Sequence, residues 1–279
     1  MLAVAFVAVA LMPIINALLV STEEREVDED SMPFAFIATH FDVLHIYAWI
    51  FIGMIAAYTF WSVALPEDNS GCTGMGCFLP EKSKVFSEQK KVYGGITGKL
   101  VGESECFSDR TKSFEKCFRL IFNNNTWVMI LAVIFSFIWG AGAIFLLGWN
   151  ASVIGLFIGA EITSRSIDAG IVRAISYLPH GIPEITAYFL AAIAGGIISA
   201  AISKKKFRKD ELRIVFIDTF MLLLLAVITL LIGAFIETAA IFSQWEASLG
   251  GVIAFIALYA ILYIPSVRYR VNKMRESGN

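Results

Sequence analysis

Charged side chains are scarce in this chain, and their scarcity excludes a soluble globular protein. Of the 279 residues, 16% are charged and 57% are hydrophobic. A soluble domain of this size needs more polar surface to stay in water. The formal net charge of −2 also provides no basic surface for nucleic acid. We therefore expect a multi-pass protein of the cell membrane that is surrounded by the lipid bilayer and binds no nucleic acid.

The sequence motifs of several enzyme classes are missing as well. The chain contains no GxxxxGK[ST], GxSxG or HExxH motif, and no GxGxxG motif in the required context. These absences argue against ATP hydrolysis, a serine-hydrolase elbow and a zincin-type protease. These three enzyme classes are therefore not expected for this chain.

Basic residues are absent from the first apolar segment, Met1–Val20. A secretory signal peptide normally has a basic n-region and a small-residue cleavage site, and neither is evident here. We expect this segment to be retained as a membrane span, and a cleaved signal is the alternative.

Apolar segments of membrane-spanning length recur along the rest of the chain. A hydrocarbon core about 30 Å thick needs roughly 20 apolar residues of helix. Together with the first segment, five others reach or approach that length: Val43–Leu65, Thr126–Leu147, Glu184–Ser203, Ile214–Ile236 and Leu249–Val267. The apolar segment Ala151–Ile162 is short, so it either re-enters the membrane or crosses it as a short span. The predicted fold class is all-α, a polytopic transmembrane helical bundle of six full spans plus a short or re-entrant helix.

The links between these segments divide the chain into four parts. Residues 1–65 hold two spans and an acidic connecting loop, residues 66–119 form an extramembrane polar loop domain, residues 120–267 form the transmembrane core, and residues 268–279 form a basic tail. The positive-inside rule places Lys204–Arg213 and the basic tail in the cytoplasm. The loops Ser164–Pro183 and Glu237–Ser248 are then outside. The loop at 66–119 is expected outside if Ala151–Ile162 crosses the membrane, and inside if it re-enters.

All four cysteines lie in the polar loop, at Cys72, Cys77, Cys106 and Cys117. An even, clustered set of this kind is typical of disulfides in an oxidising compartment. Their spacing lacks the C-x2-C pairs of common zinc sites, so zinc is the less favoured alternative. We predict at least one disulfide among them.

Polar side chains in or beside apolar helices mark the candidate functional site. Glu161, His180 and Glu184 lie near the ends of neighbouring apolar segments, and a charge inside a bilayer costs roughly 2.5 to 3.5 kcal/mol on insertion scales. If they meet at the outer membrane face, they could bind a divalent metal such as zinc or share a proton. In the alternative interpretation, His180 and Glu184 cap the helix that follows Pro183 and bind loop backbone.

Two more polar residues accompany these three. Asn150 begins the same region, after Gly148 and Trp149. Glu237 follows Phe235 and Ile236 at the outer end of a span. It either joins the outer cluster or marks the helix end, and the second interpretation is favoured because a carboxylate at an interface costs little.

Several of these residues together give a resemblance to a known family. They are Phe122-Asn123-Asn124-Asn125, Asn150 with Gly155 and Gly159, the run from Leu178 to Glu184, the Ala/Gly-rich helix after it, and Phe235-Ile236-Glu237. Over about residues 118–267 the chain resembles the stage II sporulation protein M family of integral membrane proteins. The first span, the acidic loop and the cysteine loop lie outside this resemblance. The resemblance implies a non-enzymatic membrane component whose sporulation member works with partner proteins in cell-wall remodelling.

Two hypotheses of different classes follow for the function. The first is a non-enzymatic membrane component that binds or scaffolds membrane or extracytoplasmic protein partners, with a homo-oligomer as an open alternative. The second is a transporter or ion-handling protein that uses Glu161, His180 and Glu184. A membrane-embedded metal-dependent enzyme ranks third.

Overall fold

The structure is a computed structural model, and its described part is helical. It describes residues 4–15, 17, 35–67, 79–96, 106, 113–140, 142–203 and 209–277. After a short apolar helix, Val4–Ile15, the labelled helices are α2 (Ala35–Ala64), α3 (Lys82–Val85), α4 (Ser87–Ile96), α6 (Phe114–Trp139), α7 (Ala143–Ser164), α8 (Ile167–Ser203), α9 (Lys209–Ile241) and α10 (Trp245–Ser277). The all-α helical-bundle prediction is confirmed.

Six helices are long and apolar enough to cross a membrane, namely α2, α6, α7, α8, α9 and α10. The chain is therefore a multi-pass membrane protein. The expected number of full spans holds within the described residues, but their identity differs. Ala151–Ile162 is the middle of the full-length helix α7, and the expected span Met1–Val20 is described only in part, as the apolar helix Val4–Ile15, because residues 1–3, 16 and 18–20 lie outside the described residues.

The expected span Thr126–Leu147 is wrong, because two helices meet inside it. Gly140 ends α6 with a φ of 65°, a conformation that glycine adopts without the penalty of a Cβ. At Gly142, a Cβ would clash with the backbone of Phe135. Gly140 and Gly142 therefore lie where α6 ends and α7 begins.

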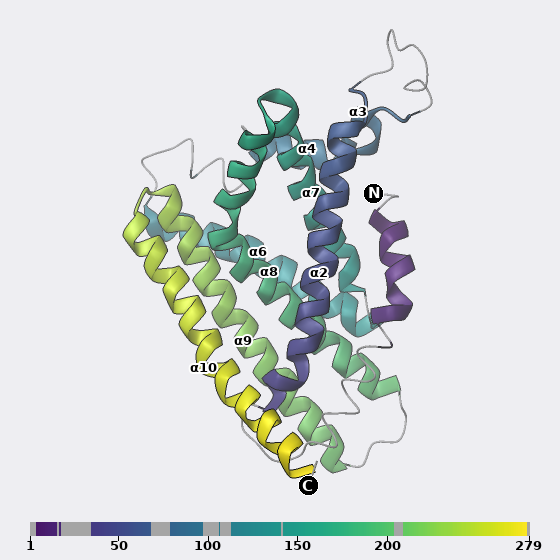
Figure 1. Ribbon diagram of the computed structural model, residues 1–279, viewed down its shortest axis with the longest axis vertical. Helices are drawn as coiled ribbons and strands as arrows, with labels where there is room; N and C mark the ends of the chain where they lie inside the picture. The colour runs from purple at the N-terminus through teal and green to yellow at the C-terminus, as the bar shows by residue number, and fades with distance from the viewer. Residues whose placement is uncertain are drawn as a thin grey trace.

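The expected loop Ser164–Pro183 is also wrong, because α8 begins at Ile167 and continues to Ser203. Pro179 and Pro183 both lie inside this helix. Each proline removes one backbone donor and crowds the preceding turn, which bends a helix. Figure 1 shows α8 bent rather than straight. Glu184 consequently lies in the interior of a helix, not at a helix N-terminus.

The second part of α8 forms the centre of the bundle. Every residue from Ala187 to Ile197 is buried, which indicates a helix covered on all sides. It packs against α6, α7 and α9, and α2 reaches it through Phe189, whose ring lies 5.6 Å from Tyr47 and 5.9 Å from Phe51. Small residues allow the closest approach, since a Cβ on Gly195 would lie 2.5 Å from the Val133 carbonyl oxygen of α6.

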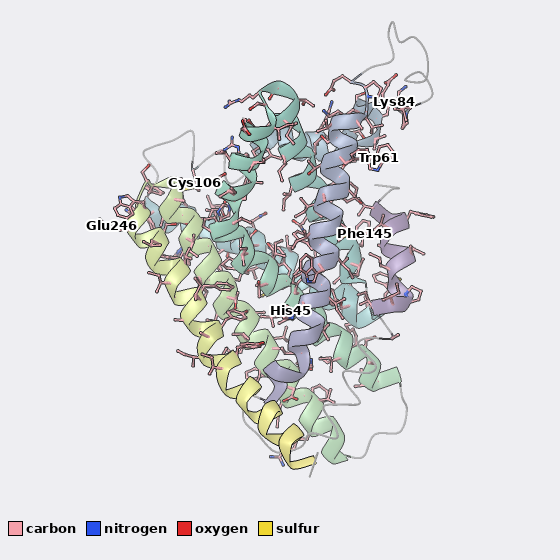
Figure 2. All side chains as sticks on the ribbon, in the orientation of Figure 1. His45, Trp61, Lys84, Cys106, Phe145 and Glu246 are labelled. Atoms are coloured by element: carbon pink, nitrogen blue, oxygen red, sulfur yellow. A yellow bond between two sulfur atoms is a disulfide. The ribbon has the colours of Figure 1, made fainter. Side chains whose placement is uncertain are left out.

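One end of the bundle, here called the hairpin end, carries α3, α4 and the turns joining α7 to α8 and α9 to α10, whereas the C-terminus lies at the other end (Figure 1). Figure 2 shows Lys84, Cys106 and Glu246 toward the hairpin end and His45 farther along α2. If the basic tail faces the cytoplasm, as its charge predicts, the hairpin end faces the opposite compartment.

The helices α3 and α4 are anchored on the spans beneath them. The Gln89 amide donates to Ser152 Oγ on α7 at 3.0 Å, and the Phe86 ring lies 6.4 Å from Tyr58 on α2. Lys82 and Lys90 hold Glu67 at 2.9 and 2.8 Å. The described part of the polar loop domain is thus packed against the bundle.

Candidate functional site

The structure separates the candidate residues into two polar clusters along α8. Among the described residues, no three His, Cys, Asp or Glu side chains are arranged to hold a metal ion. Glu161, His180 and Glu184 therefore do not form a metal-ligand group in this arrangement, and the sequence-based metal site gains no support from it.

The first cluster, called the hairpin cluster, surrounds Glu161 near the turn between α7 and α8. The Glu161 carboxylate is 12% exposed and pairs with Arg165 Nε at 3.4 Å and Arg173 Nη2 at 3.5 Å. The Arg173 guanidinium also lies over the Phe157 ring, 4.9 Å from its centre, a favourable cation–π geometry. Two arginines thus compensate the charge of this carboxylate.

His180 belongs to the hairpin cluster through aromatic contacts. Its ring lies 5.6 Å from Tyr177 in an edge-to-face arrangement, and Tyr177 lies 5.1 Å from Phe157 in the same manner. Aromatic contacts of this kind contribute about 0.5 to 1.5 kcal/mol beyond burial. His180 therefore extends the row of rings that begins under Arg173.

The second cluster, called the core cluster, is formed by Asn125, Glu184, Tyr188 and Glu237, on α6, α8 and α9. The buried Asn125 amide donates to Glu184 Oε1 at 2.8 Å. The hydroxyl of Tyr188 lies within electrostatic range of both Glu184 and Glu237. Gly233 on α9 makes room for the approach, because a Cβ there would lie 2.8 Å from Glu184 Cγ.

The two remaining candidates have separate environments. Glu237 lies near the end of α9, which continues to Ile241. Asn150 is half-buried on α7 and donates to the Leu146 carbonyl one turn earlier at 2.9 Å.

Sequence reasoning missed Asn125, Tyr188 and Gly233 as members of a site. Asn125 has a usable signal, because a polar amide inside an apolar span needs a partner. Tyr188 reads as an ordinary core aromatic and Gly233 as a packing residue. Only the pairing of α8 with α6 and α9 reveals that they meet.

The cysteines agree in part with their prediction. Cys106 and Cys117 form a disulfide, so the expectation of at least one disulfide is confirmed. Cys72 and Cys77 lie outside the described residues.

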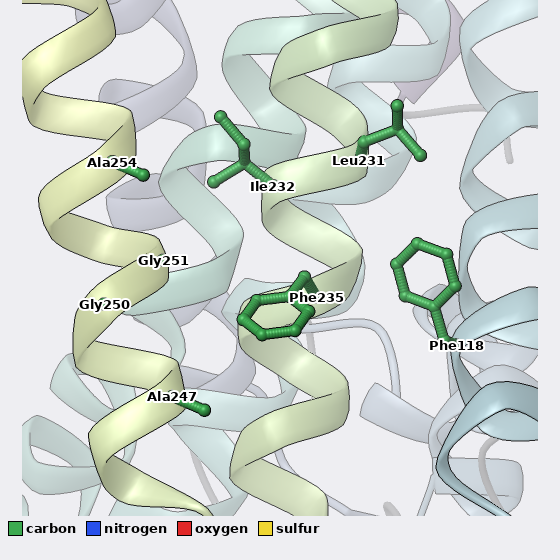
Figure 3. A pocket seen from close by; sticks show the side chains of 8 residues that line it. All are labelled: Phe118, Leu231, Ile232, Phe235, Ala247, Gly250, Gly251 and Ala254. Carbon is green, nitrogen blue, oxygen red and sulfur yellow. The ribbon is translucent and has the colours of Figure 1, made fainter.

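A groove of about 550 Å³ opens between α6, α9 and α10 (Figure 3). Its lining consists of Phe118, Leu231, Ile232, Phe235, Ala247, Gly250, Gly251 and Ala254. None of these side chains can take up a proton or coordinate a metal, so the groove has no chemistry of its own.

Comparisons with known proteins give a family. The family model described as stage II sporulation protein M matches residues 5–240. This range includes the first helix and the cysteine-bearing segment, which the sequence resemblance left outside, and it ends before α10. No curated protein and no solved structure matches the chain. The helical architecture and the extent of the match lead to one conclusion: this chain belongs to the stage II sporulation protein M family of integral membrane proteins.

Proposed function

We propose that this protein is a non-enzymatic membrane component that binds a helical partner protein through the first half of α8. The observation that carries this proposal is a row of exposed apolar side chains on that helix. The row, called the α8 stripe, consists of Ile171, Ile175, Leu178 and Ile182, which are 48 to 58% exposed.

The spacing of the α8 stripe is that of a helix–helix contact. Its members are separated by steps of four, three and four residues, the pattern of a coiled-coil seam. Side chains at these steps lie on one face of a helix. A partner helix, lying in a membrane or at its surface, would cover them as it covers the seam of a coiled coil.

The charged neighbours of the stripe favour a protein partner over lipid tails. Asp168 and Arg173 are exposed on the same half of α8, and exposed charges are costly inside the hydrocarbon core. A surface that carries both charges and a continuous apolar row is typical of an interaction site. The disulfide between Cys106 and Cys117 at the hairpin end is consistent with a partner in an oxidising compartment.

The test is site-specific photo-crosslinking of the full-length protein in its native membrane. A photoreactive residue replaces Ile175 in one variant and Ile256 of α10 in the control. The two isoleucines are matched, because they are 58% and 59% exposed. We expect a defined protein adduct from position 175 that is absent from position 256.

Two results would count against the proposal. Adducts of equal yield at both positions, or lipid adducts alone at position 175, would identify the stripe as ordinary lipid-facing surface.

An adduct of twice the chain mass would make the partner a second copy of this protein. Loss of the adduct in an Ile171→Glu variant would strengthen the assignment to the stripe.

A further inference from the structure

We propose that the groove between α6, α9 and α10 binds one acyl chain of a zwitterionic phospholipid whose headgroup lies at the hairpin end. The groove shares no residue with the α8 stripe, so this inference goes beyond the partner-binding function proposed above and does not depend on it. Four of its eight lining residues belong to α10, which begins after the end of the family match at residue 240.

The groove has a floor and two walls, as Figure 3 shows. The floor is formed by α9, and the walls are formed by α10 and α6. At Gly251 a Cβ would lie 2.5 Å from the Ile236 side chain, so α10 touches α9 there. At Gly250, one residue earlier, a Cβ would meet nothing within 4 Å. The groove is therefore open beside Gly250.

The lipid bilayer is the medium that surrounds this groove, because all three helices are long and apolar enough to span a membrane. Among the described spans, α10 is the least covered by protein, with 6% of its apolar stretch buried against 72% for α8. Lipid tails are as apolar as the lining, so the fit of the chain decides binding rather than the hydrophobic effect. An unfilled groove loses dispersion contacts, and a hydrocarbon chain restores them.

The size of the groove favours an acyl chain over a helix. Ala247 and Ala254 are seven residues apart, which is about 10 Å along a helix. A space of about 550 Å³ over that length has a cross-section of roughly 50 Å². A helix with side chains is about 10 Å across and needs roughly 80 Å². An extended hydrocarbon chain is thinner than a helix and fits this space.

One end of the groove lies at the level of the helix termini. The Phe114 ring lies 5.8 Å from Phe235 and 5.6 Å from Phe242, which precedes the turn into α10. Phe118 and Ala247, which line the groove, lie within the first two turns of α6 and α10. This end of the groove is therefore close to the membrane surface, where a headgroup would lie.

Exposed charges of both signs border that end of the groove. Arg119 follows Phe118 and pairs with Glu115 at 2.7 Å, and both side chains are more than 70% exposed. Glu246 precedes Ala247 and is also exposed, at the hairpin end (Figure 2). A guanidinium binds a phosphate well, and a carboxylate attracts an ammonium group. A headgroup that carries both a phosphate and an ammonium group complements these charges.

The experiment uses the purified full-length protein in phosphatidylcholine vesicles that contain a small fraction of phosphatidylcholine with a diazirine on one acyl chain. After irradiation, mass spectrometry locates the lipid adducts. We expect the groove lining of α9 and α10 to carry more adducts than the exposed face of α2. Gly250→Leu should lose most of the groove adducts, because its side chain enters open space without a clash.

Gly53→Leu is the matched control. It makes the same change on α2, where a Cβ also meets nothing within 4 Å, and it should leave the groove adducts unchanged. Arg119→Gln leaves every lining residue in place and should reduce the groove adducts about fivefold. It keeps the test decisive if Gly250→Leu does not fold.

Three results would overturn the proposal. The first is an even spread of adducts over the exposed faces of α2 and α10, and the second is groove labelling that neither Gly250→Leu nor Arg119→Gln changes. The third is a protein adduct from a photoreactive residue at Ala254 in native membranes, which would make a protein helix the occupant of the groove.

Discussion

The hairpin end and the centre of the bundle are held together by different forces. At the hairpin end, charged side chains pair in partly solvated positions, as in Glu67 with Lys82 and Lys90, and a disulfide ties the start of α6. In the centre, small residues let helix backbones touch, as at Gly195, and an uncharged donor, the amide of Asn125, satisfies a partly buried carboxylate. Stability in the centre should therefore depend on how closely the helices fit together, whereas stability at the hairpin end should depend on pH, salt concentration and reducing conditions.

The largest expected effect comes from adding one methyl group in the centre. Gly195→Ala places a Cβ 2.5 Å from the Val133 carbonyl oxygen, so α6 and α8 must separate, at a cost of about 3 kcal/mol. Gly181→Ala is the control on the same helix, because a Cβ there meets nothing within 4 Å. It should be neutral or stabilise by about 0.5 to 1 kcal/mol. Unfolding in detergent measures the stability of both variants. Equal effects of Gly195→Ala and Gly181→Ala would show that close packing at Gly195 does not decide stability.

Loss of the disulfide should have the next largest effect, and it acts on the hairpin end. Cys106 and Cys117 are 11 residues apart, and closing a loop of that size stabilises by roughly 2 to 3 kcal/mol in the chain-entropy model. We expect the double variant Cys106→Ser/Cys117→Ser to lose about that much. Reduction of the wild type should reproduce the loss. Alkylation of both thiols without prior reduction would show that the bond does not form.

Removing one polar bond in the centre should cost less. Asn125→Ala deletes the donor to Glu184 and leaves a partly buried carboxylate oxygen without that donor, at about 1 to 2 kcal/mol. Asn123→Ala is the control, since Asn123 is exposed on the same helix. Chemical unfolding of the two variants provides the comparison. Equal unfolding midpoints would show that the bond from Asn125 to Glu184 does not stabilise the protein.

The smallest expected effect is the pH dependence of the hairpin end. Hydrogen bonds from Lys90 and then Lys82 lower the pKa of the Glu67 carboxyl below its ordinary value of 4.5. A carboxyl with a lowered folded-state pKa stabilises fully above its unfolded pKa, and this contribution is lost as pH falls through the folded value. Because the side chain is 65% exposed, the contribution should stay below about 1 kcal/mol and weaken in high salt.

That dependence can be measured by acid titration of stability in wild type and Glu67→Gln. The wild type should lose its advantage below pH 4.5, whereas the variant should show no step from this group. An advantage that persists at acid pH would assign the stabilisation to packing of Lys82 rather than to charge.

The apolar character of long segments is sufficient to predict the helical membrane fold, because such segments have few other stable arrangements in a bilayer. The same signal fails where a single residue decides the backbone. Gly140 divides one apolar stretch into α6 and α7. The hydropathy of that stretch does not predict the positive φ that Gly140 adopts. Pro183 suggests a helix start, yet α8 continues through both Pro179 and Pro183, since tertiary contacts outweigh the lost backbone bonds.

The candidate site is only partly predictable for a similar reason. The sequence predicts Glu161, His180 and Glu184 as polar residues at the ends of apolar segments, but their partners come from other elements or other turns. Arg173 and Asn125 reach Glu161 and Glu184 respectively. A sequence shows which polar side chains need a partner for their charge or hydrogen bonds, whereas helix packing decides which residue is that partner.

The bend in α8 has a mechanical consequence. Pro179 and Pro183 cannot donate to the carbonyls of Ile175 and Pro179, so the helix is softest along this turn. In effect, α8 consists of two stiff helical segments joined by a more flexible turn. Gly181 lies between the prolines and faces open space, since a Cβ there would meet nothing within 4 Å. A load on the α8 stripe would therefore be absorbed mainly as flexing at this turn, while Ala187–Ile197 keeps its place among α6, α7 and α9.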